Sequence, residues 1–344
     1  MAHVLVTGGA GYIGSVLVPV LLGRAHRVTV VDRFYFGEGT LAAVRDDARL
    51  TVVRADVRRV DPRVFEGVDA VVDLAGISND PACELDADLT RSVNLEGGKR
   101  VQRLAHAAGV GRIVFASSCS VYGHGEGTQL TETSPLHPVS LYAQCKAEVE
   151  KSLLELGTKA GVCATSLRFA TVFGLSPRMR FDLAVNVMTK NAYTQQRIVI
   201  DGGGKQWRPF VHVGDVAEAI ARTLEMPVET VRGEVLNVGS NDNNVRILNL
   251  GYRVRDAIPG THVEISGTDP DLRDYNVNFD KIAGVLGWKP GRSVDDGIAE
   301  VLSALKRGQI DPDDRRGYTL KQYVFLADVE RAFREVAIDG NVLS

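Results

Sequence analysis

Short apolar runs rich in β-branched residues alternate with helical stretches over the first half of this 344-residue chain. Runs of this kind are typical of strands buried on both faces of a parallel sheet, because the helices that connect such strands cover both faces. We therefore predict an α/β fold with a doubly wound parallel sheet. The expected strands are Val4–Thr7, Val28–Asp32, Thr51–Arg54, Ala70–Leu74, Arg112–Ser117 and Ala164–Phe169, and the expected helices between them include Ile13–Leu22, Leu89–Ala108 and Leu141–Leu156.

After about Gly174 the regular alternation ends. Two later runs, Phe210–Val213 and Val235–Val238, are expected to return to the main sheet. The segments that precede and follow these two runs predict a smaller mixed α+β unit, and a tail with one helix is expected at the end of the sequence. The other elements expected here are Phe181–Thr194, Ile198–Asp201, Val263–Ser266, Asp280–Leu286, Val294–Lys306 and, in the tail, Leu326–Ala337.

The composition narrows the class of protein. Hydrophobic residues make up 44% of the chain and charged residues 24%, as in globular proteins. A formal net charge of −3 gives no broad basic surface for nucleic acid, and no apolar run approaches the ~18 residues of a membrane span. The first residues lack the pattern of a secretory signal, and the four cysteines and seven histidines are too dispersed for a metal site. We expect a cytoplasmic protein with free thiols and no metal, which binds neither nucleic acid nor membrane.

The first strand leads through a glycine-rich turn, Thr7-Gly8-Gly9-Ala10-Gly11-Tyr12-Ile13-Gly14, into the first helix. Glycines allow a diphosphate to approach the backbone at the helix N-terminus, where free N–H groups and the helix dipole favour an anion. Asp32, at the end of the second strand, is placed to accept hydrogen bonds from an adenosine ribose and to repel a 2′-phosphate. Arg33 could accommodate NADP, but the carboxylate favours NAD as the cofactor.

Tyr142 and Lys146 are four residues apart in an expected helix, so they lie on one face about one turn apart. A neighbouring ammonium favours the phenolate and makes tyrosine a better base near neutral pH. Ser117 and Ser118 follow an expected strand, which places their hydroxyls at the carboxyl edge of the sheet where ligands bind in open α/β folds.

Together these motifs resemble an extended short-chain dehydrogenase/reductase, specifically the NAD-dependent sugar-nucleotide epimerase/dehydratase family. The resemblance runs from residue 3 to about 305, and nothing beyond about 310 matches. The matching segments are Thr7–Ser15, Asp32, Asp56–Val57, Leu74–Gly76, Asn94, Ser117–Gly123, Tyr142–Lys146, Leu167–Phe169, Trp207–Ala217, Val235–Ser240 and Asp280–Pro290.

The resemblance implies a Rossmann domain for NAD, formed by residues 1–174 and about 209–240. It implies a substrate domain for a nucleotide-diphosphate sugar, formed by residues 175–208 and about 241–310, with 311–344 as a tail. It also implies a homodimer, paired through the helices expected at Leu89–Ala108 and Leu141–Leu156.

By position, the resemblance makes Tyr142 the general base and acid. Ser118 would share a hydrogen bond with the reacting hydroxyl, and Lys146 would hold the nicotinamide ribose and lower the tyrosine pKa. Asn94 would support the active-site backbone, and Arg208 would hold the substrate's diphosphate. The residues expected at the cofactor are Gly8, Gly11, Tyr12, Ile13, Gly14, Asp32, Arg33, Asp56, Val57, Leu74, Ala75, Gly76, Asn94, Ser117, Tyr142, Lys146 and Phe169, and those expected at the substrate are Ser78, Asn79, Ser118, Tyr142, Asn186, Arg208 and Arg273.

The residues after Ser118 bear on the reaction. Dehydratases of the family carry an Asp-Glu pair at this place, and decarboxylases tend to carry a Glu, whereas this chain has Cys119 and Ser120. Without that carboxylate pair an elimination lacks its acid and base, which favours a 4-epimerase that recycles NAD. The alternatives are an NDP-sugar ketoreductase, a 4,6-dehydratase, a 3- or 5-epimerase that uses Cys119 or Ser120, and a non-enzymatic NAD-binding scaffold. Thr171 stands where the family often has asparagine, which leaves the substrate open.

Overall fold

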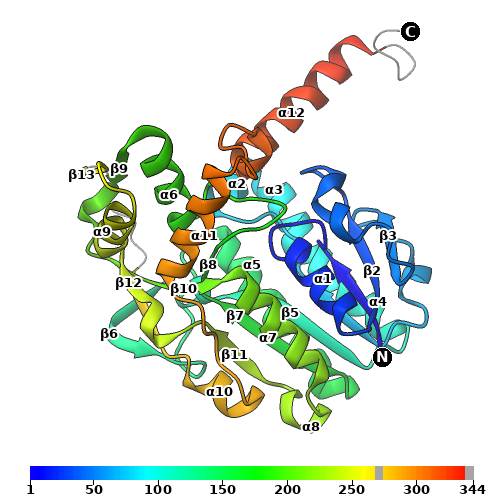
Figure 1. The fold of residues 1–344 in the computed structure, drawn as a ribbon. Helices are drawn as coiled ribbons and strands as arrows, with labels where there is room; N and C mark the ends of the chain where they lie inside the picture. Colours follow the sequence, from blue (N-terminus) through cyan, green and yellow to red (C-terminus); the bar gives the residue numbers. More distant parts are fainter. Residues whose placement is uncertain (268–273, 338–344) are drawn as a thin grey trace.

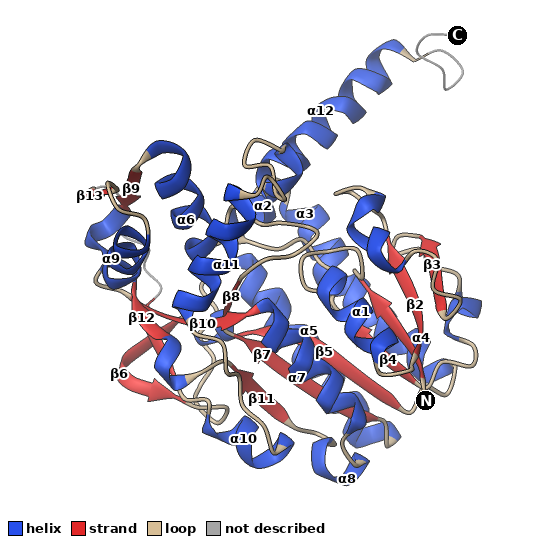
Figure 2. Cartoon of the chain, in the orientation of Figure 1, coloured by secondary structure: helices blue, strands red, loops and turns tan. Residues whose placement is uncertain are grey.

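A seven-stranded parallel sheet forms the centre of the protein in the computed structural model, which describes residues 1–267 and 274–337 (Figures 1 and 2). Its strand order is β3-β2-β1-β4-β5-β7-β11. This arrangement, with helices around the sheet, confirms the predicted α/β fold. The strands are β1 (His3–Thr7), β2 (Arg27–Asp32), β3 (Leu50–Arg54), β4 (Ala70–Asp73), β5 (Arg112–Ser118), β7 (Cys163–Phe169) and β11 (Val235–Val238).

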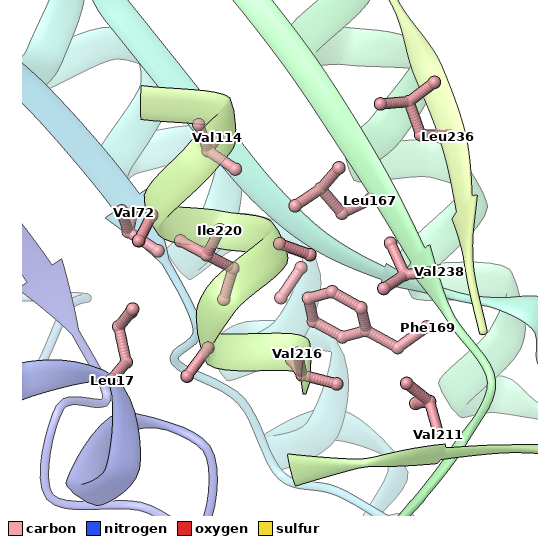
Figure 3. Close-up of a cluster of buried hydrophobic side chains, with 14 of the residues drawn as sticks. Leu17, Val72, Val114, Leu167, Phe169, Val211, Val216, Ile220, Leu236 and Val238 are labelled. Carbon is pink, nitrogen blue, oxygen red and sulfur yellow. The ribbon is translucent and has the colours of Figure 1, made fainter. Parts of the chain in front are cut away.

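Helices cover both faces of the sheet. Successive side chains of a strand point to opposite faces, so each strand contributes to two hydrophobic clusters. Val4 and Val6 of β1 belong to one hydrophobic cluster, and Leu5 between them belongs to another. The first cluster includes residues of α1 and α7, and the second includes residues of α4 and α5. Figure 3 shows α7 on the sheet, with Val216 and Ile220 packed toward strand side chains. These helices are α1 (Gly14–Gly23), α4 (Gly98–Ala107), α5 (Leu141–Ala160) and α7 (Val213–Glu225).

The order of the strands reverses between β1 and β4, which are neighbours in the sheet. In open α/β sheets the ligand crevice lies at such a reversal, outside the carboxyl ends of the strands. Thr7, Asp32, Asp73 and Ser118 are the last residues of β1, β2, β4 and β5, so this edge of the sheet collects the polar groups.

Smaller sheets lie outside the main one. A separate core joins Phe173, Val185, Phe210, Leu250 and Ile298. The three-stranded sheet has β8 (Thr171–Phe173), β10 (Trp207–His212) and β12 (Asn244–Arg246), and two strand pairs are β9 (Arg197–Ile200) with β13 (His262–Ile265) and β6 (His124–Leu130) with β14 (Asp274–Val277). The helices here are α6 (Ala184–Gln195), α9 (Ile247–Ala257) and α11 (Val294–Lys306), whereas α10 (Asp280–Leu286) packs with α7 and β11 in the first cluster.

Three elements of the structure differ from those predicted from the sequence. Val235–Val238 joins the main sheet as β11, but the run at Phe210–Val213 lies largely in β10, which pairs with β8 and β12 instead. The helix expected over Leu89–Ala108 is divided by a π-helical segment, Arg91–Gly97, which precedes α4. The tail helix α12 (Thr319–Val336) begins seven residues earlier than expected. The remaining short helices are α2 (Asp80–Glu84), α3 (Ala87–Thr90) and α8 (Val228–Val231).

No helix within residues 1–267 and 274–337 combines the length and the apolar character needed to cross a membrane.

Candidate active site

The glycine-rich turn between β1 and α1 is closely packed against its own backbone. A Cβ atom on Gly14 would lie 2.5 Å from the carbonyl oxygen of Gly8, and one on Gly8 would lie 2.9 Å from the amide nitrogen of Ala75. Gly8 also has a φ of 68°, which favours glycine. Side chains at these positions would therefore push the turn away from α1 and from the segment after β4. The turn therefore fits the diphosphate of a dinucleotide, which needs close access to that backbone.

The expected residues around this turn hold it in shape. The Tyr12 hydroxyl donates to the carbonyl oxygen of Gly174 at 2.7 Å, and Ile13 directly precedes α1. One oxygen of Asp32 accepts from the amide of Ala10 at 3.0 Å, and the other accepts from the amide of Phe34 at 2.7 Å. Burial raises the pKa of Asp32, and the hydrogen bonds from Phe34 and Ala10 oppose this shift.

Arg33 turns toward Asp56, with Nη1 2.9 Å from the carboxylate. Partial burial would raise the pKa of Asp56, but hydrogen bonds from Arg58 and Arg33 outweigh it and lower the pKa to about 2. Asp56 is shared by two guanidiniums, so the preference for NAD over NADP rests on the Asp32 carboxylate itself. Val57 is buried beside this pair.

The segment after β4 carries Leu74, Ala75 and Gly76 along the same edge. The amide of Ala75 donates to the Thr7 hydroxyl at 3.2 Å. The Asn94 side chain accepts from the amide of Ile77 at 2.7 Å and donates to the carbonyl oxygen of the same residue at 2.9 Å. Asn94 therefore supports the backbone here, from within the π-helical segment.

Tyr142, Lys146 and Ser118 come together at the carboxyl end of β5. Lys146, only 8% exposed, donates from Nζ to the carbonyl oxygen of Ala116 at 2.6 Å, and Nζ lies 5.7 Å from the centre of the Tyr142 ring. Ser140 caps α5, which carries both residues, through a bond from the amide of Ala143 at 3.3 Å. The Ser118 side chain accepts from the amide of Ser120 at 3.1 Å. The buried Ser117 hydroxyl has no hydrogen-bond partner in the described part of the chain, and its contact with the cofactor stays a prediction.

Burial raises the pKa of Tyr142 above its ordinary value, and Arg180 and Ser118 are among the groups that oppose this shift. The lowering of this pKa by Lys146, which the resemblance implies, stays a prediction. Burial in turn lowers the pKa of Lys146, whereas the nearby Asp73 raises it.

Asp73, 2% exposed, ends β4 and accepts a bond of 2.5 Å from the Thr7 hydroxyl. Burial raises its pKa to about 6, although Thr7 and Lys146 oppose the shift. The folded state thus holds this proton more tightly than the unfolded chain, where the pKa is about 3.9. The stability that protonated Asp73 contributes is full below about pH 4 and is lost as the pH rises through about 6.

The substitution Asp73→Asn should remove the loss of stability that accompanies ionisation of Asp73. We expect the variant to match the wild type below about pH 4 and to exceed its free energy of unfolding by about 3 kcal/mol above about pH 6. Urea unfolding at a series of pH values measures this difference. Asp88→Asn, at an exposed position, is the control and should keep the wild-type slope. Equal slopes for Asp73→Asn and the wild type would show that Asp73 does not titrate in this way.

The structure also brings in residues that the sequence analysis did not connect with the site. Arg180 pairs with Asp182 at 2.8 Å, and Asp182 accepts a bond of 2.6 Å from the Asn79 side chain. Arg178 is buried close by. Asp80 also acts on Tyr142, whose pKa it raises. The signal in the sequence that could have indicated these residues is the pair of arginines in Arg178-Met179-Arg180. This pair lies in the loop that begins at Gly174, directly after β8.

Several expected substrate and cofactor residues have internal partners. Asn79 caps α2 by accepting from the amide of Ala82 at 2.9 Å, and Ser78 is half-buried just before it. The Asn186 amide oxygen accepts from the amide of Gly174 at 3.0 Å, and its nitrogen donates to the Tyr12 hydroxyl at 3.1 Å. Asn186 therefore ties the Tyr12 region to the loop after β8, and its contact with a diphosphate stays a prediction.

The other expected residues lie apart from one another. Arg208, 5% exposed on β10, donates to the carbonyl oxygen of Trp207 at 2.8 Å and lies 5.3 Å from the centre of the Tyr275 ring. The Phe169 side chain packs into the hydrophobic core of Figure 3, and its expected contact with the cofactor stays a prediction. Arg273 lies outside the described residues.

Comparisons with known proteins identify relatives of this chain by sequence and by structure. The model of the NAD dependent epimerase/dehydratase family matches residues 4–239. The chain is 30% identical to UDP-glucose 4-epimerase of Corynebacterium glutamicum over 74% of its length and 78% of that protein. It is 27% identical to UDP-glucuronic acid decarboxylase 1 of Arabidopsis thaliana over 92% of its length and 72% of that protein.

Among solved structures, dTDP-glucose 4,6-dehydratase of Streptomyces venezuelae with NAD bound has a TM-score of 0.78 and 28% identity. The match covers 90% of this chain and 99% of that one. The names of these three relatives describe three different reactions, so the comparisons leave the choice among them to the residues of the site.

Proposed function

The chain belongs to the NAD dependent epimerase/dehydratase family, and we propose that it is a 4-epimerase of a nucleotide-activated sugar. The observation that carries this proposal is the placement of Tyr142 and Lys146 beside Ser118, with Cys119 and Ser120 as the next residues. The site thus has the groups for chemistry at one carbon, and positions 119 and 120 carry no carboxylate for elimination.

In this proposal Tyr142 takes the proton from the C4 hydroxyl and returns it to the C4 oxygen after the 4-keto sugar has turned over to present its opposite face. NAD, when bound, supplies the hydride acceptor and donor and a positive charge near the phenol. Ser118 shares a hydrogen bond with the same hydroxyl, and Lys146 holds the nicotinamide ribose. Arg180, which lowers the Tyr142 pKa, helps the buried phenol to act as a base.

The surroundings of Cys119 support this choice of reaction. The Cys119 thiol is 1% exposed and lies 3.3 Å from the carbonyl oxygen of Arg168, and burial raises its pKa. It is therefore a poor acid or base, which argues against its use in 3- or 5-epimerisation. The carboxylate of Asp182 is engaged by Arg180 and Asn79, so it does not replace the missing pair.

The substrate proposal rests on the part of the chain outside the main sheet. We propose that residues 175–208 and about 241–310 form the substrate domain, and that Arg208 binds the diphosphate, since a guanidinium matches phosphate oxygens. Ser78 and Asn79 are proposed to lie near the sugar. The homodimer is likewise a proposal, with the groove along α5, lined by Leu136, Ala147 and Leu154, as its apolar surface.

The test is incubation of the purified full chain with UDP-, dTDP-, GDP- and CDP-sugars, followed by mass spectrometry and NMR. The expected product has the mass of its substrate and the inverted configuration at C4. Loss of water would identify a dehydratase, and loss of carbon dioxide a decarboxylase. In a parallel incubation with NADH and nucleotide-activated keto sugars, gain of two hydrogens would identify a ketoreductase. No conversion of any sugar in either incubation would favour a scaffold. Each of these results would overturn the epimerase proposal.

A further inference from the structure

Arg178 is a buried cation with unused hydrogen-bonding capacity. The side chain is only 4% exposed, and within the described residues it has no carboxylate at ion-pair distance. Its Nη2 donates to the Thr319 hydroxyl at 2.9 Å, whereas Nε and Nη1 are buried without a hydrogen-bond partner in the described part of the chain. Buried charges are normally paired, because an uncompensated one is costly. A guanidinium in this state points to an anionic ligand.

The neighbours of Arg178 strengthen this argument. Arg180 is paired with Asp182 at 2.8 Å, and the same carboxylate raises the pKa of Arg178 from a longer distance. One carboxylate thus serves two buried guanidiniums, which leaves this pair of arginines with excess positive charge. Burial, together with the charge of Arg180, lowers the pKa of Arg178 to about 9. Arg178 therefore remains charged at neutral pH, and a bound anion would relieve both the desolvation and the repulsion from Arg180.

The loop that carries Arg178 packs directly on the start of α1. The Ser176 hydroxyl donates to the carbonyl oxygen of Tyr12 at 2.8 Å, and the Ser15 and Ser176 hydroxyls are 2.9 Å apart. The charge of Arg178 lowers the pKa of both Tyr12 and Asp32. The guanidinium thus lies near the turn that fits a diphosphate and near the carboxylate that fits a ribose.

The first turns of α12 hold this corner together. Besides the bond from Arg178 to Thr319, the Gln322 side chain donates to the carbonyl oxygen of Tyr35 at 2.7 Å. The Tyr323 ring makes edge contacts with the rings of Tyr35 and Phe36, and the Arg178 guanidinium stacks 3.6 Å from the centre of the Phe36 ring. The rest of α12 extends away from the body in Figure 1.

We infer that Arg178 binds the diphosphate of the dinucleotide as a second anion-binding group beside the glycine-rich turn, held in place by Thr319 of the C-terminal helix. This inference rests on the NAD dependence of the family and not on the choice of an epimerase. A nucleotide sugar also carries a diphosphate, so the test separates the two sources.

The test is calorimetric binding of NAD, ADP-ribose, adenosine and UDP to the full chain and to Arg178→Gln. We expect the variant to bind NAD and ADP-ribose about 10- to 100-fold more weakly, because it loses a charge-assisted hydrogen bond. Binding of adenosine, which has no phosphate, and of UDP should be unchanged. Arg63→Gln, which removes an exposed guanidinium paired with Asp61, is the matched control and should behave as wild type.

Thr319→Val tests the inference without loss of the buried charge. It should weaken NAD binding by a smaller factor, while circular dichroism shows a folded chain. Wild-type affinity for NAD in a folded Arg178→Gln variant would overturn the inference. Weaker UDP binding with unchanged NAD binding would assign Arg178 to the substrate instead, and if Arg178→Gln does not fold, unchanged NAD binding by Thr319→Val overturns the role of α12. Failure of the wild type to bind NAD would refute the cofactor assignment itself.

Discussion

Replacement of Tyr142 by phenylalanine is expected to lower kcat by about 10²- to 10⁴-fold, the range in which a general acid–base group contributes. The substitution removes only the hydroxyl that would take the sugar proton, and the ring keeps its place beside Lys146. NAD binding and the free energy of unfolding should therefore stay close to the wild-type values. Initial rates with the best sugar of the panel, together with NAD content and urea unfolding, measure the three quantities.

Tyr193→Phe is the control for this experiment, since Tyr193 is an exposed tyrosine on α6. It should retain wild-type turnover. Equal turnover of Tyr142→Phe and the wild type would mean that another group removes the proton. A loss of NAD binding in Tyr142→Phe would mean that the hydroxyl serves the cofactor rather than the reaction.

Gly14→Ala is expected to destabilise the protein by about 1–3 kcal/mol or more and to abolish tight NAD binding. The new Cβ would lie 2.5 Å from both the Gly8 carbonyl oxygen and the Gly9 Cα, so the turn or α1 must move. Since these contacts are with backbone, no flexible side chain can yield. Unfolding in urea and the NAD content of the purified protein measure the two effects.

The matched control is Gly23→Ala at the other end of α1, where an added Cβ meets no atom within 4 Å. This change should leave NAD binding intact and alter stability by less than about 1 kcal/mol, because alanine is the better helix former. If Gly14→Ala folded and bound NAD as the wild type does, the close packing of the turn would not be needed for the cofactor.

The main sheet could be predicted because its strands are buried on both faces and read as continuous apolar runs. The glycine-rich turn and the Tyr142–Lys146 spacing were also readable, since each depends on residues close in sequence. The position of β10 could not be predicted, because an apolar run of this kind fits a strand of either sheet. Its place in the three-stranded sheet depends on its pairing with β8 and β12, which are distant in sequence.

The contacts of Arg178 could not be predicted for a similar reason. Its partners Phe36 and Thr319 lie far away in the sequence, and an arginine in a loop ordinarily points to solvent. The pKa of Tyr142 likewise depends on burial and on Arg180 from a distant loop, neither of which follows from the spacing of Tyr142 and Lys146.

The most direct test of the proposed reaction uses a nucleotide hexose that carries deuterium at C4, incubated with the enzyme in ordinary water. Removal and return of hydrogen at one carbon predicts a C4 epimer of unchanged mass that keeps its deuterium at C4. A product lighter by one water, with deuterium at C6 or lost from C4, would contradict the account.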